Sequence, residues 1–89
     1  MKKIALLLTV LTITAHAQIE SDLLRSLSRA ERKLNEVWNE KLTPAERQEL
    51  RPDERKWVRW KDTLPLEQEE QAVWARVDFL NKFVQDHAQ

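Results

Sequence analysis

The stretch Leu42-Thr43-Pro44-Ala45-Glu46 decides how this chain folds. Thr43 can accept a hydrogen bond from a backbone N–H at the start of a helix, and Glu46 can return one to the Thr43 amide. Pro44 suits the first helical position, where a missing N–H costs nothing. The stretch therefore predicts that one helix ends near Leu42 and that a second begins at Pro44.

Upstream of this junction, apolar residues recur at the spacing of an amphipathic helix. Ser21 is a plausible N-cap, with Asp22 favourable in the first turn. The stripe, mostly in steps of four and three, consists of Leu23, Leu27, Ala30, Leu34, Val37 and Leu42. We therefore expect the first helix to run from Ser21 to Leu42.

Downstream, the second helix should continue from Pro44 through Asp62, although Pro52 interrupts it. A proline inside a helix removes one hydrogen bond and costs roughly 3 kcal/mol. The helix is therefore expected to kink near Pro52 or to break there into two pieces.

A third helix is predicted from Pro65 to about Asp86. Its apolar stripe repeats at helical spacing and consists of Leu66, Val73, Val77, Leu80 and Val84. No stretch shows the alternation of a strand, so the predicted fold is all-α, a small antiparallel bundle of three main helices.

Residues 1–17 have the layout of a secretory signal peptide. Lys2 and Lys3 give a positive start, an apolar run follows from Ile4 to Ile13, and Ala15-His16-Ala17 is a small-x-small cleavage site. An N-terminal anchor or a buried helix is the alternative. Because the run is too short to span a bilayer, integral membrane association is not expected. The sequence predicts export of residues 18–89, as one domain, to the periplasm or the medium.

The composition of residues 18–89 argues against several classes of function. Residues 18–89 include thirteen basic and fifteen acidic residues, and such a nearly balanced charge does not favour nucleic acid as a partner. The chain has no Cys and no Gly, and His87 is the single His after residue 17. Thiolate metal sites, glycine-dependent phosphate loops and Ser-His-Asp triads therefore lack their parts. We expect a protein without a metal, a cofactor or enzymatic activity.

The candidate partner-binding residues are charged. Arg47, Arg51, Arg55 and Arg59 are spaced by four and would form one basic ridge on a helix. Arg suits an anionic partner because its guanidinium forks onto carboxylates. The alternative is a solvated face, with Glu54 and Asp62 compensating the repulsion. Three acidic residues form a second candidate group at the start of the last helix, namely Glu67, Glu69 and Glu70.

Four tryptophans are an unusually large number for so small a domain. Trp38, Trp57 and Trp74 lie on or beside an apolar face of three different predicted helices, so we expect them in the core. Trp60 lies at the edge of its stripe and is the tryptophan expected to be partly exposed and to contact a partner.

Two segments together resemble the lysozyme-inhibitor LprI-like N-terminal domain family. Ala30–Trp38 (AERKLNEVW) resembles its AD-x-x-LN-x-x-Y stretch, and Leu50–Asp62 (LRPDERKWVRWKD) resembles its LR-x-AQR-x-W-x-x-(Y/F)RD stretch. The link at residues 42–46 and Arg76–Leu80 are similar too. The chain departs from the family's pattern at Pro52 and in having no Cys. The resemblance implies an exported, small helical domain and, for some relatives, lysozyme inhibition.

These observations lead to two main hypotheses. The first is an exported protein-binding module that acts on another protein, with lysozyme as a candidate. The second is a component of the cell envelope that self-associates through its Trp-rich faces, because a small domain without disulfides gains by burying apolar surface between copies. An amphipathic protein of the membrane surface is a third and weaker hypothesis.

Overall fold

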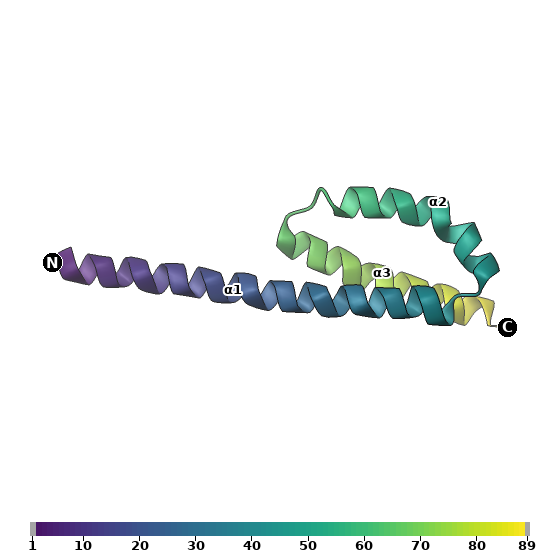
Figure 1. Cartoon of the computed structure of the whole chain (residues 1–89), viewed down its shortest axis with the longest axis horizontal. Helices are drawn as coiled ribbons and strands as arrows, with labels where there is room; N and C mark the ends of the chain where they lie inside the picture. The colour runs from purple at the N-terminus through teal and green to yellow at the C-terminus, as the bar shows by residue number, and fades with distance from the viewer. Residues whose placement is uncertain (1, 89) are drawn as a thin grey trace.

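The computed structural model describes the backbone of residues 2–88 and the side chains of residues 17–88. Its elements are α1 (Lys2–Glu36), a π-helical turn η1 (Val37–Lys41), α2 (Pro44–Lys61) and α3 (Leu66–His87). Residues 2–88 contain no strand. The chain runs from left to right along α1, returns along α2 and runs from left to right again along α3, and α3 lies beside α1 (Figure 1). The predicted all-α fold of three main helices is confirmed.

The first helix begins earlier than the pattern predicted. α1 passes through Ser21 without interruption, so Ser21 is not an N-cap. No Gly or Pro precedes Ser21, and nothing in the local sequence therefore stops a helix there. Most side chains of the predicted signal peptide, residues 1–17, lie outside the described residues.

The junction between α1 and α2 is a complete capping box, as predicted. The Glu46 amide donates to Thr43 Oγ1 at 3.1 Å, and the Thr43 amide donates to Glu46 Oε1 at 2.8 Å. Just before it, the Leu42 amide donates to the Val37 carbonyl at 3.1 Å, the five-residue step of a π-turn. The wider turn places Leu42 in the core, where its side chain is buried.

The core consists of two apolar clusters that share the partly buried Leu34. One lies under the junction and is built from Val37, Leu42, Leu50, Val77 and Leu80. The other lies between α1 and α3 and is built from Leu27, Ala30 and Val73. The apolar stripes of the first and third helices therefore face one another, as their spacing predicted.

α2 is one helix that contains Pro52, so the chain does not divide there. In Figure 1, α2 changes direction along its length, which is the effect expected of an interior proline. Pro52 itself is exposed, and only Leu50 of α2 is buried. The bend therefore lies on a helix that touches the core at few points.

The capping box gives stability a defined dependence on pH. The hydrogen bond from the Thr43 amide lowers the pKa of Glu46 below its ordinary value of 4.5. Because the folded pKa is the lower one, ionised Glu46 contributes fully above pH 4.5, and this contribution is lost as the pH falls through the folded value.

We expect Glu46→Gln to be less stable than the wild type at neutral pH, and the difference to shrink as the pH is lowered below 4.5. Urea unfolding of both proteins at a series of pH values measures this difference. A gap that stays constant from neutral to acid pH would contradict the role of the charge.

Candidate functional site

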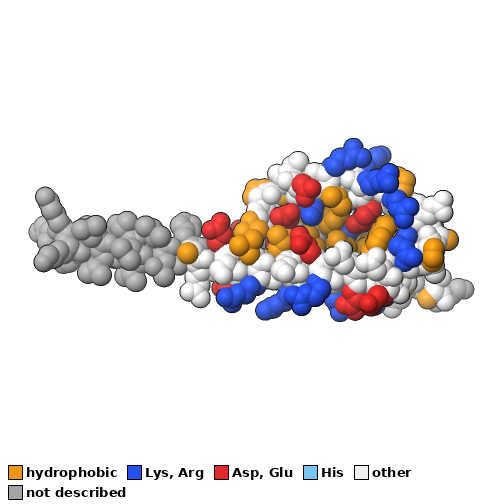
Figure 2. Space-filling view, viewed as in Figure 1, with side chains coloured by type: hydrophobic (Ala, Val, Ile, Leu, Met, Phe, Trp, Pro, Cys, Tyr) orange, Lys and Arg blue, Asp and Glu red, His pale blue; other side chains and the backbone are white. Residues whose placement is uncertain are grey.

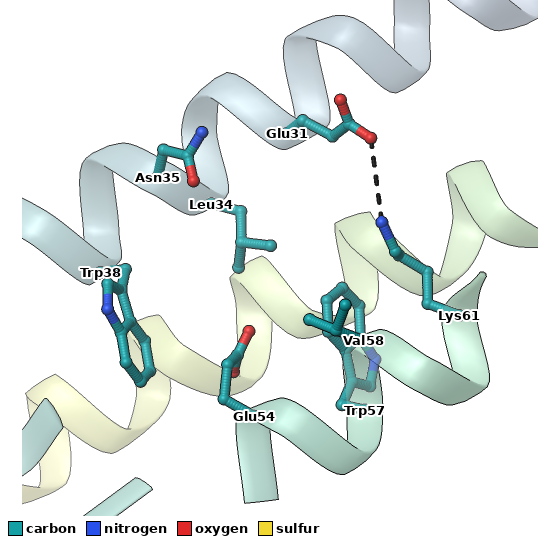
Figure 3. Close-up of a pocket in the computed structure, with 8 residues that line it drawn as sticks. All are labelled: Glu31, Leu34, Asn35, Trp38, Glu54, Trp57, Val58 and Lys61. Carbon is teal, nitrogen blue, oxygen red and sulfur yellow. Dashed lines mark ion pairs between the residues drawn. The ribbon is translucent and has the colours of Figure 1, made fainter. Parts of the chain in front are cut away.

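A groove lies between α1 and α2. Its first part is a hollow of about 330 Å³ lined from the α1 side by Leu34, Asn35 and Trp38 and from α2 by Trp57 and Val58, with Glu31, Glu54 and Lys61 completing it. Figure 3 shows these side chains facing one another from the two helices. A second hollow of about 420 Å³ continues from it and shares Trp38, Glu54 and Val58. We call the two hollows together the α1–α2 groove.

Three of the four predicted arginines border this groove. Arg51, Arg55 and Arg59 line its second hollow and are exposed. None of the ion pairs among the described side chains involves any of the three. We call them the arginine stripe. Figure 2 shows basic side chains in a run along α2, beside apolar side chains in the hollow between α1 and α2.

Arg47 does not belong to the stripe, because it closes the π-turn. Its Nη1 donates to the carbonyl oxygens of Leu42 at 2.7 Å, Trp38 at 3.2 Å and Asn39 at 3.3 Å. These carbonyls lie at the end of a helix, where they lack partners within the helix. Arg47 is therefore a capping residue, a role that the four-residue spacing did not reveal.

The residues expected to compensate the stripe are engaged elsewhere. Glu54 pairs with Arg76 of α3, and Asp62 pairs with the neighbouring Lys61 at 3.2 Å. Lys61 also approaches Glu69 at 3.6 Å and Glu31 at 4.0 Å, the latter drawn as the dashed line in Figure 3. The predicted compensation is thus wrong: Glu54 lines both hollows of the groove, but it forms its ion pair with Arg76 and not with the stripe.

Arg76 is the residue that the sequence analysis missed. Its side chain is only 8% exposed, and it donates to Glu54 Oε2 from Nε at 2.8 Å and to Asp53 Oδ2 from Nη2 at 2.9 Å. The guanidinium carbon also lies 4.6 Å from the ring centre of Phe79 and 5.5 Å from that of Trp57. The sequence did contain one indication of this role: Arg76 stands directly before Val77, a member of the apolar stripe of α3.

The three acidic candidates do not form one free surface. Glu67 is exposed, but Glu69 contacts Lys61. Glu70 Oε1 accepts a hydrogen bond from Ser26 Oγ at 2.6 Å. Two of the three carboxylates are therefore occupied in holding α3 to its neighbours.

The tryptophans divide differently from the prediction. Trp38 and Trp57 are half-buried and pack against the core, whereas Trp74 is 36% exposed and donates from Nε1 to Ser26 Oγ at 3.3 Å. The prediction for Trp74 is wrong because position 74 lies just outside the buried stripe of α3, which consists of Val73, Arg76, Val77 and Leu80. Trp60 is 54% exposed, as expected.

Trp60 does not lie beside the arginine stripe. It borders a separate hollow of about 230 Å³ between α2 and α3, which we call the aromatic patch and which is lined by Trp57, Trp60, Ala72, Ala75, Arg76 and Phe79. α2 therefore presents two distinct flanks, a basic one toward α1 and an aromatic one over α3.

Within the described residues, no three His, Cys, Asp or Glu side chains are arranged to hold a metal ion. His87 stacks on Phe83 with 3.9 Å between ring centres, and its Nδ1 lies 2.8 Å from the Phe83 carbonyl oxygen. No helix among the described residues is both long and apolar enough to span a bilayer.

Comparison of the chain with protein-family models, with characterised proteins and with solved structures finds no match. The resemblance to the LprI-like domain family therefore rests on the sequence motifs quoted above.

The pairing of Arg76 is testable by substitution. Arg76→Met should lower the free energy of unfolding by about 3 kcal/mol, because it leaves the largely buried Glu54 without its partner. Asp53→Ala should cost less than about 1 kcal/mol, since Asp53 is 62% exposed.

Urea unfolding measures each change. The double variant Glu54→Met with Arg76→Met should lose less than the sum of the two single variants, since it leaves no buried charge unpaired. An Arg76→Met variant as stable as the wild type would contradict this account.

Proposed function

We propose that the chain is an exported protein-binding module whose recognition surface is the α1–α2 groove with its arginine stripe. The observation that carries the proposal is that Arg51, Arg55 and Arg59 are exposed on one helix beside an open apolar hollow. None of the three forms an ion pair among the described residues. Apolar surface next to Arg is the composition of interface hot spots.

The chemistry of the remaining charged side chains supports binding over catalysis. Three largely buried charges, those of Glu54, Lys61 and Arg76, are all in ion pairs: Glu54 with Arg76, and Lys61 with Asp62 and Glu69. A catalytic acid or base needs an environment that shifts its pKa toward the working pH. Paired groups of this kind instead hold the three helices in place. Export follows from the predicted signal peptide at residues 1–17.

Lysozyme is the partner that the resemblance in sequence suggests. A typically basic lysozyme would be attracted by acidic surface and repelled by the arginine stripe. Of the three acidic candidates, only Glu67 is free of the internal contacts that engage Glu69 and Glu70. The arrangement of charges therefore favours an acidic partner, and lysozyme is included in the test as the contrasting case.

The test reverses the stripe with Arg51→Glu, Arg55→Glu and Arg59→Glu together. A matched control reverses Arg25, Arg29 and Arg32, which are also exposed and similarly spaced on α1. We expect the wild type and the control to capture a protein from the exported fraction of the producing cell, and the stripe variant to lose it, because like charges then face each other.

Titration with purified lysozyme is measured in parallel. If lysozyme is the partner through acidic surface, the stripe variant should bind it more tightly than the wild type does. Capture of the same proteins by wild type, control and stripe variant would contradict the assignment of the recognition surface.

Self-association is the second candidate, and the aromatic patch favours it. Trp60 and Phe79 are 54% and 46% exposed and lie at one hollow together with Ala72 and Ala75. Exposed aromatic side chains grouped in this way are typical of interaction sites.

On this alternative, the protein sediments as a larger species as its concentration rises, and Trp60→Ser restores the monomer. Leu24→Ser is the matched control, because Leu24 is similarly exposed, at 53%, on α1. A monomer at every concentration would contradict self-association and leave the groove as the recognition surface.

A further inference from the structure

We propose that the α1–α2 groove receives an amphipathic helix of the partner protein, with the acidic flank of that helix on the arginine stripe. The inference rests on the proposed function and specifies what the groove binds. Its first support is the packing of the three helices. α3 packs against both α1 and α2, whereas the backbones of α1 and α2 stay apart, so the bundle has one open edge.

The open edge has the side chains that a fourth helix needs. Leu34, Trp38 and Val58 present apolar surface toward the groove, and Val58 is 38% exposed. A helix that lies between two others buries an apolar stripe against both and completes a four-helix arrangement. The groove thus offers an apolar floor for one face of the incoming helix.

The arginine stripe specifies the charge on one flank of that helix. Arg51, Arg55 and Arg59 are four residues apart, so they follow α2 at intervals of about 6 Å and span about 12 Å. Carboxylates four residues apart on a second helix repeat at the same interval. Each guanidinium can fork onto one carboxylate, and the three pairs fix the register of the incoming helix.

A second copy of this chain fits the stripe poorly. Its acidic residues four apart are Glu36 with Glu40 and Glu49 with Asp53, and no run contains three. One member of each couple is already paired, Glu36 with Lys33 and Asp53 with Arg76. The occupant is therefore a helix from a different protein.

The experiment uses the purified protein and three synthetic helical peptides of about 18 residues, long enough to pass the whole stripe. One peptide carries Leu on one face and Glu at every fourth position on the adjoining flank. The other two replace these Glu residues by Gln or by Lys. Fluorescence anisotropy of labelled peptide measures binding at low and high salt.

We expect the Glu peptide to bind most tightly and the Lys peptide least tightly, and added salt to weaken the binding of the Glu peptide selectively.

Reversal of the stripe at Arg51, Arg55 and Arg59 should weaken the binding of the Glu peptide about 30-fold. Val58→Asp, which places a charge on the apolar floor, should weaken it about tenfold. The control reversal of Arg25, Arg29 and Arg32 should change it less than about twofold. Circular dichroism and thermal unfolding verify that each variant is folded.

Equal affinity for the Glu and Gln peptides, or an equal loss in the control variant, would overturn the inference. So would a wild type that dimerises while the stripe variant stays monomeric, because the occupant would then be a second copy. If the stripe variant loses its captured partner but no peptide binds, the protein-binding function stands and the helical occupant is wrong. If capture is also unchanged, both proposals fall.

Discussion

The position of α2 depends on the guanidinium of Arg76. In α2, Leu50 is the one buried apolar residue, and the half-buried Trp57 packs against the cluster of Leu27, Ala30 and Val73. Farther along, Arg76 binds Asp53 and Glu54 and lies over the rings of Trp57 and Phe79. Replacing a buried ion pair by apolar residues is often neutral, but removing one partner is costly. The pair therefore matters chiefly because it fixes where α2 lies.

The same contact fixes the rotation of α2 about its axis. Leu50, Glu54, Trp57 and Lys61 lie on the less exposed face of α2, and the helical period leaves one flank on each side of that face. The arginine stripe falls on the flank beside the α1–α2 groove, and Trp60 falls on the flank that joins the aromatic patch. One buried ion pair thus separates the two surfaces on which the proposals for binding and for self-association rest.

Several features of the fold were predictable because they depend on neighbours in sequence. The capping box at Thr43 and Glu46 involves residues three apart, and the apolar stripes of the first and third helices follow the helical period. The site was predictable only in part. Three of the four arginines share the groove, but Arg47 caps the π-turn, and the π-turn leaves no recognisable pattern in the sequence.

By itself the sequence determined which segments after Ser21 are helical, where they are joined and which stripes face inward, because these properties depend on residues at most a few positions apart. Only the tertiary structure decided which charges are free. Glu54 and Arg76 are 22 residues apart, and Ser26 and Glu70 are 44 apart. Whether a side chain meets a partner on another helix depends on how the helices are rotated and spaced. In this arrangement Arg47, Glu69 and Glu70 bind partners within the protein, whereas Arg51, Arg55 and Arg59 face solvent.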